Sequence, residues 1–223
     1  MKPITVLLAD DHMIVREGFR KLLESEPDLL VVAEAQTGRQ AVELAAKHRP
    51  EVVVMDISMP LLNGLEATRQ IRKALPSTKV VILSAHGDGP YVEKAIELGV
   101  SGFLFKQSSA TTLANAIRAV HRGAVAFSPA ITKRLSAGKL PGKNAPAPKR
   151  APALTSRELE VLQLIAESKA NKEVASELGI GIKTVEKHRE HLMQKLDIHD
   201  AAGLTRYALT IGIIECDLQS SAE

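Results

Sequence analysis

Polar side chains that could handle a phosphoryl group stand at the ends of four apolar runs in the first half of the chain. Asp10 and Asp11 follow the first run, Asp56 closes the second, Ser84 closes the third and Lys106 follows the fourth. A carboxylate can attack phosphorus to give an acyl phosphate. Because two anions repel each other, this reaction needs a cation between them. These residue types therefore predict phosphoryl transfer to an aspartate.

The predicted cation is Mg²⁺, which binds a few carboxylates and keeps several waters. Asp56 is the best nucleophile, because it stands alone at the end of the central apolar run. Asp10 and Asp11 are better placed as ligands of the cation, together with Asp56 itself. The backbone carbonyl of Ser58, which follows Asp56 in the next loop, completes the predicted metal site.

Two further side chains complete the predicted chemistry. Lys106 is expected to act as a point charge on the phosphoryl oxygens, and Ser84 as a hydroxyl donor to one of them. A plainer explanation is that aspartate and serine end strands because they favour turns. Turn preference can explain each of these residues alone, but it does not explain why all of them are expected at the same edge of the sheet as Lys106.

The apolar runs have the length and the branched side chains of strands buried on both faces. Segments with helical spacing separate them, so we expect parallel strands whose C-terminal ends share one ligand-binding edge. The pattern predicts an α/β domain with a five-stranded, parallel, doubly wound sheet. The expected strands cover Ile4–Asp10, Leu29–Ala35, Val52–Asp56, Lys79–Ser84 and Gly102–Phe105. The expected helices cover Met13–Ser25, Thr37–His48, Leu65–Leu75, Pro90–Leu98 and Ser109–Arg122.

With 223 residues, 45% of them hydrophobic and 25% charged, the chain resembles a soluble globular protein of one large or two small domains. No apolar run approaches the ~18–20 residues of a membrane span, so no membrane partner is expected. The start, Met1-Lys2-Pro3, does not resemble a signal peptide. The single cysteine, Cys216, excludes an internal disulfide and is best explained as a small apolar filler. We therefore expect a cytoplasmic protein.

The net charge of +3 is unevenly spread along the chain. Residues 1–127, the expected phosphoacceptor domain, carry +1, whereas residues 128–153 carry +6 and residues 154–223 carry −4. The middle segment starts with a possible short helix and continues as a stretch rich in Pro, Ala and Lys, which is typical of a linker. A plain tether explains this linker better than a dedicated DNA-binding arm does.

From Leu154 the pattern becomes all-helical. The expected helices cover Thr155–Ser168, Asn171–Leu178, Ile182–Leu196 and Ala201–Ile211. A tight Gly179-Ile180-Gly181 turn joins the second helix to the longer third helix, which is typical of a helix-turn-helix. We expect this four-helix DNA-binding domain over residues 154–216, followed by a tail at 217–223.

The N-terminal part of the third helix is the predicted DNA-reading element, because recognition helices present these side chains to base edges. The predicted contacts are Glu186, Lys187 and Glu190 with bases, and Lys183, Thr184, His188 and Lys195 with phosphates. Glu186 has a structural alternative, since it could instead pair along the helix with Arg189 or His191. Gly181 and Asp197 are weaker helix ends than a serine cap and a terminal glycine would be.

Both halves of the chain resemble known families. Leu8-Ala9-Asp10-Asp11-His12, Asp56-Ile57-Ser58-Met59-Pro60 with Gly64, Ser84-Ala85 and Gly102-Phe103-Leu104-Phe105-Lys106 resemble the receiver domain of two-component response regulators. Leu154-Thr155-Ser156-Arg157-Glu158, Val185-Glu186-Lys187-His188-Arg189 and Gly212-Ile213-Ile214 resemble the LuxR-type DNA-binding module. Together they resemble the NarL/FixJ class, and only the linker lies outside the resemblance. It implies a flavodoxin-like first domain.

The resemblance implies that Asp56 accepts a phosphoryl group from a sensor histidine kinase, with Mg²⁺ held by Asp10, Asp11 and Asp56. It also implies that Ser84 and Phe103 form a switch pair that reports phosphorylation to the helix after the fourth strand. Many receivers carry tyrosine where this chain has Phe103, so the hydrogen bond of a tyrosine hydroxyl is not expected. The ring of Phe103 could instead be plain core.

The leading hypothesis is a phosphorylation-dependent transcriptional regulator, and not an enzyme beyond its own phosphoryl transfer and dephosphorylation. It would bind double-stranded DNA at inverted-repeat promoter sites as a homodimer formed on phosphorylation. The expected dimer face of the first domain is the helix Pro90–Leu98 with its neighbouring strand. That of the second domain is the helix Ala201–Ile211, which carries Leu204, Ala208 and Ile211 on one stripe.

Two alternatives remain open at this point. The −4 charge of the helical domain allows a phosphorylated adaptor that acts by protein–protein contact. An aspartyl-phosphate hydrolase fits less well, because such enzymes usually place two acids two residues apart after the first strand. Here Asp10 and Asp11 are adjacent.

Overall fold

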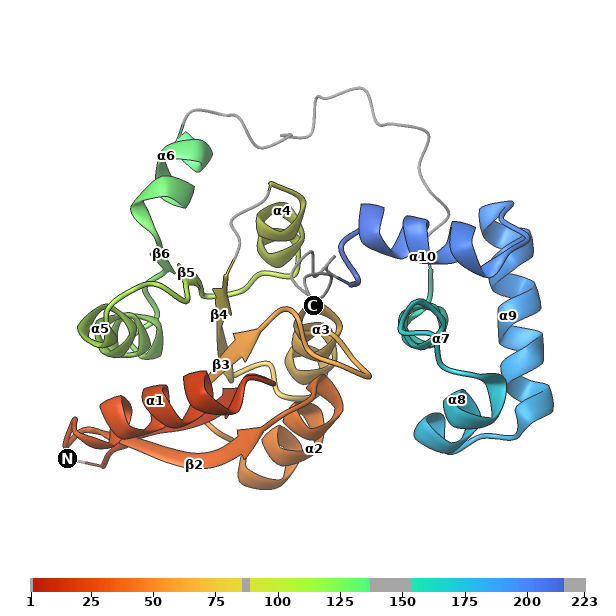
Figure 1. Ribbon diagram of the computed structural model, residues 1–223. Coiled ribbons are helices and arrows are strands. Elements are labelled where there is room, and N and C mark those ends of the chain that lie inside the picture. The colour runs from red at the N-terminus through yellow and green to blue at the C-terminus, as the bar shows by residue number, and fades with distance from the viewer. Residues whose placement is uncertain (1, 86–88, 137–153, 215–223) are drawn as a thin grey trace, which may run out of the picture. The chain divides into compact units, whose positions relative to one another are not determined.

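The computed structural model describes residues 2–85, 89–136 and 154–214 (Figure 1). The predictions for most of the linker (137–153), for the tail (217–223) and for Cys216 lie outside these residues. The chain divides into two compact units, residues 1–145 and residues 146–223. The first is an α/β unit, and the described part of the second is helical.

The first unit is built on one parallel sheet with the strand order β2-β1-β3-β4-β5-β6. The strands are β1 (Ile4–Ala9), β2 (Leu29–Ala35), β3 (Val52–Asp56), β4 (Lys79–Ser84), β5 (Gly102–Phe105) and β6 (Ala126–Phe127). In the register of the sheet, Ala9 pairs with Met55 and Ser84 pairs with Phe105. The polar residues that close or follow these strands therefore meet at one edge, as predicted.

Helices cover both faces of this sheet (Figure 1). They are α1 (Met13–Glu24), α2 (Gly38–His48), α3 (Gly64–Ala74), α4 (Gly89–Glu97), α5 (Ala110–His121) and the short α6 (Pro129–Ser136). Successive strand residues point to opposite faces: Val53 and Met55 pack with α2, α3 and α4, and Val52 and Val54 pack with α1 and α5. The predicted boundaries of these elements differ from the observed ones by at most two residues.

The sheet has six strands and not the predicted five. The sixth strand, β6, pairs in parallel with β5 through Gly102–Ala126 and Phe103–Phe127. Two residues are too few to show a period-2 pattern, so the sequence gives no signal for this strand. It forms because Ala126 and Ser128 donate backbone hydrogen bonds to the β5 side of the sheet, at Ser101 and Phe103.

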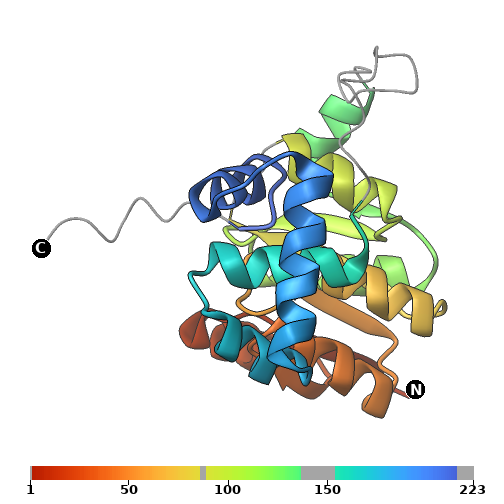
Figure 2. The same cartoon turned by 90° about the vertical axis from the view of Figure 1, so that its right-hand side faces the viewer.

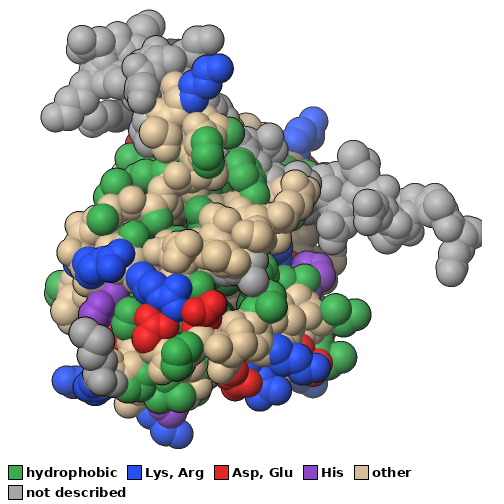
Figure 3. All heavy atoms as spheres, turned by 90° about the vertical axis from the view of Figure 1, so that its left-hand side faces the viewer, with side chains coloured by type: hydrophobic (Ala, Val, Ile, Leu, Met, Phe, Trp, Pro, Cys, Tyr) green, Lys and Arg blue, Asp and Glu red, His purple; other side chains and the backbone are tan. Residues whose placement is uncertain are grey.

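A cluster of charged side chains joins α5 to the turn between α1 and β2. The guanidinium of Arg118 donates to Asp28 Oδ2 at 2.7 Å and to Glu26 Oε2 at 2.6 Å. Hydrogen bonds from Arg118 lower the pKa of Asp28. Figure 3 shows acidic and basic side chains gathered on this side of the unit, among apolar ones. These groups are half-buried, and their hydrogen bonds join α5 to this turn.

The described part of the second unit consists of α7 (Ser156–Ala166), α8 (Asn171–Leu178), α9 (Ile182–Leu196) and α10 (Ala201–Thr210), as predicted (Figure 2). Thr155 and Glu158 form a reciprocal capping box at the start of α7. As expected, Gly181 gives α9 no side-chain cap, and Asp197 ends it in the left-handed conformation with φ of 55°.

The predicted dimer stripe on α10 is wrong at two of its three positions, which are core, and the helix as a dimer face stays a prediction. Leu204 and Ala208 of α10 are fully buried, and α10 packs against α7 within its own unit. Of the predicted stripe, only Ile211 is an exposed large hydrophobic residue. A helix shows the same apolar spacing whether its stripe faces its own unit or a second copy.

Gly64, the first residue of α3, is predicted to be required for the fold. A Cβ at this position would lie 1.7 Å from the carbonyl oxygen of Asp56, which is backbone and cannot rotate away. We expect Gly64→Ala to destabilise the first unit by about 3 kcal/mol, the scale of overpacked cores. The control is Gly18→Ala in α1, where nothing lies within 4 Å. Urea denaturation should show equal or higher stability for the control, and equal behaviour of both variants would contradict the argument.

Candidate functional site

The ammonium group of Lys106 joins two carboxylates at the C-terminal edge of the sheet. Its Nζ lies 2.8 Å from Asp56 Oδ2 and 2.8 Å from Asp10 Oδ2. Asp56 ends β3 and is buried, and Asp10 directly follows β1 and is also buried. The structure therefore brings together three residues that stand far apart in the sequence.

Asp11 and His12 complete the group on the solvent side. Ligand atoms of Asp10, Asp11, His12 and Asp56 all lie within 4.8 Å of one another. The Nδ1 atom of His12 is 2.8 Å from Asp11 Oδ1, and its backbone N–H donates to Asp10 Oδ1 at 2.9 Å. His12 was not among the residues predicted from the sequence, although its place directly after two aspartates was a usable signal.

Burial and the neighbouring carboxylates disfavour the charged form of Asp56. Burial, helped by the charges of Asp10 and Asp11 and opposed by Lys106, raises the pKa of Asp56 to about 7. For Lys106, burial disfavours the charged form, but Asp56 and Asp10 outweigh it and raise the pKa of the ammonium group. An additional positive charge would therefore be stabilised here.

The donors present fit a hard divalent cation. Three carboxylates supply the oxygen ligands that Mg²⁺ prefers. In addition, the buried Asp10 Oδ2 accepts no hydrogen bond of good geometry from any described residue, although it is close to the charge of Lys106. Ser58 is half-buried in the loop after Asp56, and its carbonyl as a ligand stays a prediction. That loop is closed by the backbone N–H of Gly64, which donates to Ile57 O at 2.8 Å.

The predicted switch residues lie on neighbouring strands. Ser84 is buried at the end of β4, opposite Phe105 in the sheet. Phe103 is fully buried and makes an edge-to-face contact with Phe105 at 6.4 Å between ring centroids. It belongs to the core cluster that also holds Val92 and Ala95 of α4. Phe103 is thus core in this structure, and its role in a switch stays a prediction.

The predicted DNA-reading side chains lie mostly on the exposed side of α9. Those that are exposed are Lys183, Thr184, Glu186, Lys187 and Glu190, and His188 is half-buried. Val185 and Leu192 point instead into the core of the unit. One surface of α9 therefore carries the predicted base contacts while the other anchors the helix.

Lys195 differs from the other predicted contacts because it has a partner within the unit. Its Nζ lies 2.8 Å from Glu158 Oε2, the same oxygen that accepts the backbone N–H of Thr155 in the capping box. Burial opposes the charged form of Glu158, but these hydrogen bonds prevail and lower its pKa. Lys195 therefore fastens α9 to α7, and a phosphate contact would have to compete with this pair.

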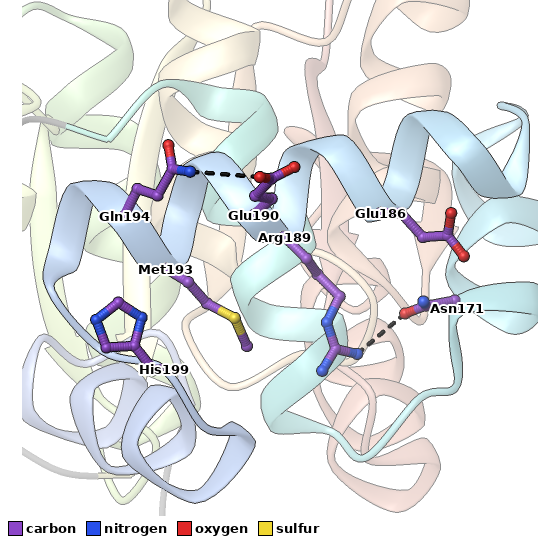
Figure 4. Close-up of a pocket in the computed structure, with 7 residues that line it drawn as sticks. All are labelled: Asn171, Glu186, Arg189, Glu190, Met193, Gln194 and His199. Carbon is purple, nitrogen blue, oxygen red and sulfur yellow. Dashed lines mark hydrogen bonds between the residues drawn. The ribbon is translucent and has the colours of Figure 1, made fainter.

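A groove of about 410 Å³ runs beside the predicted reading surface (Figure 4). It is lined by Asn171, Glu186, Arg189, Glu190, Met193, Gln194 and His199. Arg189 donates to Asn171 Oδ1 at 3.0 Å and so joins α9 to α8. Among the described residues Glu186 forms no ion pair with Arg189 or His191, so the structural alternative for Glu186 finds no support.

Because the pKa of Asp56 is raised, we expect the difference in stability between Asp56→Asn and the parent protein to depend on pH. Because the pKa of Asp56 in the folded state, about 7, lies above the ordinary value of 3.8 for an aspartate, folding between these pH values takes up a proton. The stability that protonated Asp56 contributes to the fold is fully present below about pH 4. It is lost as the pH rises to about 7, because the folded protein must then hold a buried carboxylate. Without Mg²⁺ at pH 8 we expect the Asn variant to be more stable by about 4 kcal/mol. At pH 4 the two should match.

The measurement is urea denaturation of both proteins between pH 4 and pH 8, with and without Mg²⁺. Since a cation that binds only the folded state stabilises it, Mg²⁺ should narrow the difference at pH 8. A difference that does not change with pH would show that Asp56 is not held at a raised pKa.

Both units match known protein families. Residues 6–118 match the response regulator receiver domain, and residues 152–208 match the bacterial regulatory proteins of the luxR family. The transcriptional regulatory protein LiaR of Bacillus subtilis is 42% identical over 206 residues, which cover 92% of this chain and 96% of LiaR. The described residues contain no helix that is long and apolar enough to cross a membrane.

Solved structures agree with this assignment. A two-component response regulator of the LuxR family from Aurantimonas sp. SI85-9A1 is 38% identical, with a TM-score of 0.59, covering 62% of this chain and 99% of that one. A structure of two RcsB dimers bound to two parallel DNAs is 26% identical, with a TM-score of 0.57, covering 94% of this chain and 99% of that one. The chain therefore belongs to the LuxR-family response regulators, and it is a phosphorylation-dependent regulator of transcription.

Proposed function

We propose that Asp56 is the phosphoacceptor and that a sensor histidine kinase is the phosphoryl donor. The observation that carries this proposal is the shared ammonium of Lys106, 2.8 Å from both Asp56 and Asp10 at the ligand-binding edge of the sheet. Asp56 is the buried carboxylate at the end of the central strand, so it is the one that a phosphoryl group would reach between Lys106 and the acidic pair.

We propose that the carboxylates of Asp10, Asp11 and Asp56 and the carbonyl of Ser58 hold Mg²⁺. When bound, the cation offsets the repulsion between the attacking carboxylate and the phosphoryl oxygens. An oxygen of Asp56 attacks phosphorus, and the bond from phosphorus to the donor breaks. Lys106 then leaves its ion pair with Asp56 to neutralise a phosphoryl oxygen, and the hydroxyl of Ser84 donates to another.

In this proposal the reaction is a signal and not a turnover cycle. The chain is a transcriptional regulator and not a typical enzyme, so the hydrolase alternative has no support from the family matches over both units. Phosphorylation would reposition Ser84 and the buried ring of Phe103, which packs beside α4. The surface around α4 is the proposed route of the signal to dimerisation.

We further propose that the second unit binds double-stranded DNA through α9 at inverted-repeat sites. The exposure of Lys183, Lys187 and their neighbours supports this, as does the related RcsB, whose dimers have been solved on DNA. A twofold-symmetric dimer reads an inverted repeat because each copy presents α9 to one half-site. Since the target is genomic DNA, the proposed compartment is the cytoplasm.

The phosphoacceptor assignment predicts the labelling pattern of two variants. Asp56→Asn should abolish Mg²⁺-dependent labelling by a small phosphodonor, because an amide is not a nucleophile of this kind. Asp28→Asn removes a half-buried carboxylate that directly precedes β2, at the opposite end of the strands from the site, and should be labelled normally. The measurement is incorporation of labelled phosphate into folded protein. Labelling of Asp56→Asn at the parent rate would move the acceptor to Asp10 or Asp11.

The coupling of phosphorylation to DNA binding predicts a dimer-dependent affinity. Residues 154–223 carry −4, so one unit has little general attraction for DNA, and pairing two units raises the affinity through effective concentration.

Lys187→Ala should weaken specific binding by about tenfold or more, whereas Lys47→Ala on α2 should not. We would titrate promoter DNA with both phosphorylation states and measure the mass in solution. Equal affinity in both states, or tight binding by a monomer, would contradict the proposal.

A further inference from the structure

An arginine that the chemistry does not use lies buried beside the site. Arg16 is on the first turns of α1, and its side chain is only 7% exposed. Its Nη1 donates to the backbone carbonyl of Asp10 at 2.7 Å, and its Nε donates to Glu34 Oε2 of β2 at 3.3 Å. A guanidinium is costly to bury, and these two hydrogen bonds compensate for the loss of its hydration.

The carbonyl that Arg16 holds belongs to the peptide between the two predicted cation ligands. The N–H of Asp10 donates to Ala35 O of β2 at 3.1 Å, which fixes the other side of this residue. Because a peptide unit is planar, fixing the carbonyl of Asp10 also fixes the N–H of Asp11 and the direction in which the chain leaves β1. The plane contains the Cα atoms of both residues, so their positions are fixed with it.

We propose that Arg16, oriented by Glu34, is a positioning residue that holds Asp10 and Asp11 in place for the cation. The inference rests on the proposed Mg²⁺ site. Arg16 touches neither carboxylate of the pair in its described contacts, so it acts through the backbone. Its planar fork has two donors that diverge toward the two acceptors, a geometry that the single ammonium of a lysine cannot reproduce.

Arg20, one turn further along α1, offers a matched control. Its Nε lies 3.5 Å from Glu34 Oε1, so it shares the carboxylate partner of Arg16. Its side chain is 40% exposed, and none of its described contacts is with Asp10. Removal of either arginine takes one positive charge from the same neighbourhood, but only removal of Arg16 releases the Asp10 carbonyl.

The test compares Arg16→Met, Arg16→Lys and Arg20→Met with the parent protein in the full-length chain. Mg²⁺ affinity is measured by calorimetry, because the chain has no tryptophan to report binding by fluorescence. Urea denaturation and labelling by a small phosphodonor are measured in parallel. We expect Arg16→Met to weaken Mg²⁺ binding by about tenfold or more, as outer partners of metal ligands do. Arg16→Lys should recover part of the affinity, and Arg20→Met should stay within about twofold of the parent.

The Mg²⁺ affinity separates positioning from a merely structural role. If Arg16→Met lowers only the stability and binds Mg²⁺ as Arg20→Met does, the proposal is overturned. If Arg16→Met does not fold, Glu34→Gln decides, because it keeps Arg16 but removes the charge that orients it. A several-fold weaker affinity then supports the proposal, and parent-like binding overturns it. A parent protein that binds no Mg²⁺ would overturn the proposed metal site, and this inference with it.

Discussion

The structure of the site depends on one ammonium group that is shared by two buried carboxylates. Lys106 stands between Asp10 and Asp56, and without it three acidic side chains would face each other at the edge of the sheet. Burial of Asp56 and its repulsion by the other two carboxylates together outweigh the lysine, since the pKa of Asp56 remains raised to about 7. The parallel sheet thus holds together a cluster that is unfavourable by itself, and the cost of this buried negative charge is what makes the site receptive to a cation.

Much of this arrangement could be predicted because it follows from strand order and register. The apolar runs that end in Asp56 and Ser84 are long enough to identify as buried strands, and parallel strands bring their C-terminal ends together. The strand Ala126–Phe127 has no such run, and its existence depends on hydrogen bonds to β5 that no local pattern encodes. The apolar stripe at Leu204 was visible in the sequence, but its spacing does not say whether α7 or a second copy covers it.

Side-chain partners across elements were the least predictable part of both units. Lys195 has the type and the place of a phosphate contact, and only the tertiary structure shows that Glu158 already holds it. Arg189 is similarly engaged by Asn171. Such pairs join residues from different helices, so neither helical spacing nor composition points to them. They also reduce the set of side chains on α9 that can contact DNA. The lysines that remain without such a partner among the described residues lie near the N-terminus of α9, where recognition helices contact bases.

The backbone around the acidic cluster is fixed from two sides, which explains how flexible acidic side chains can form a defined site. On one side Gly64 approaches the carbonyl of Asp56 so closely that no Cβ would fit, and this closes the loop that contains Ser58. On the other side Arg16 holds the carbonyl of Asp10. Carboxylates placed by a rigid backbone keep their separation when a charge arrives. In the proposed mechanism, the energy of phosphorylation would then move Lys106 and the predicted switch residues, Ser84 and Phe103, and would not be needed to order the carboxylates.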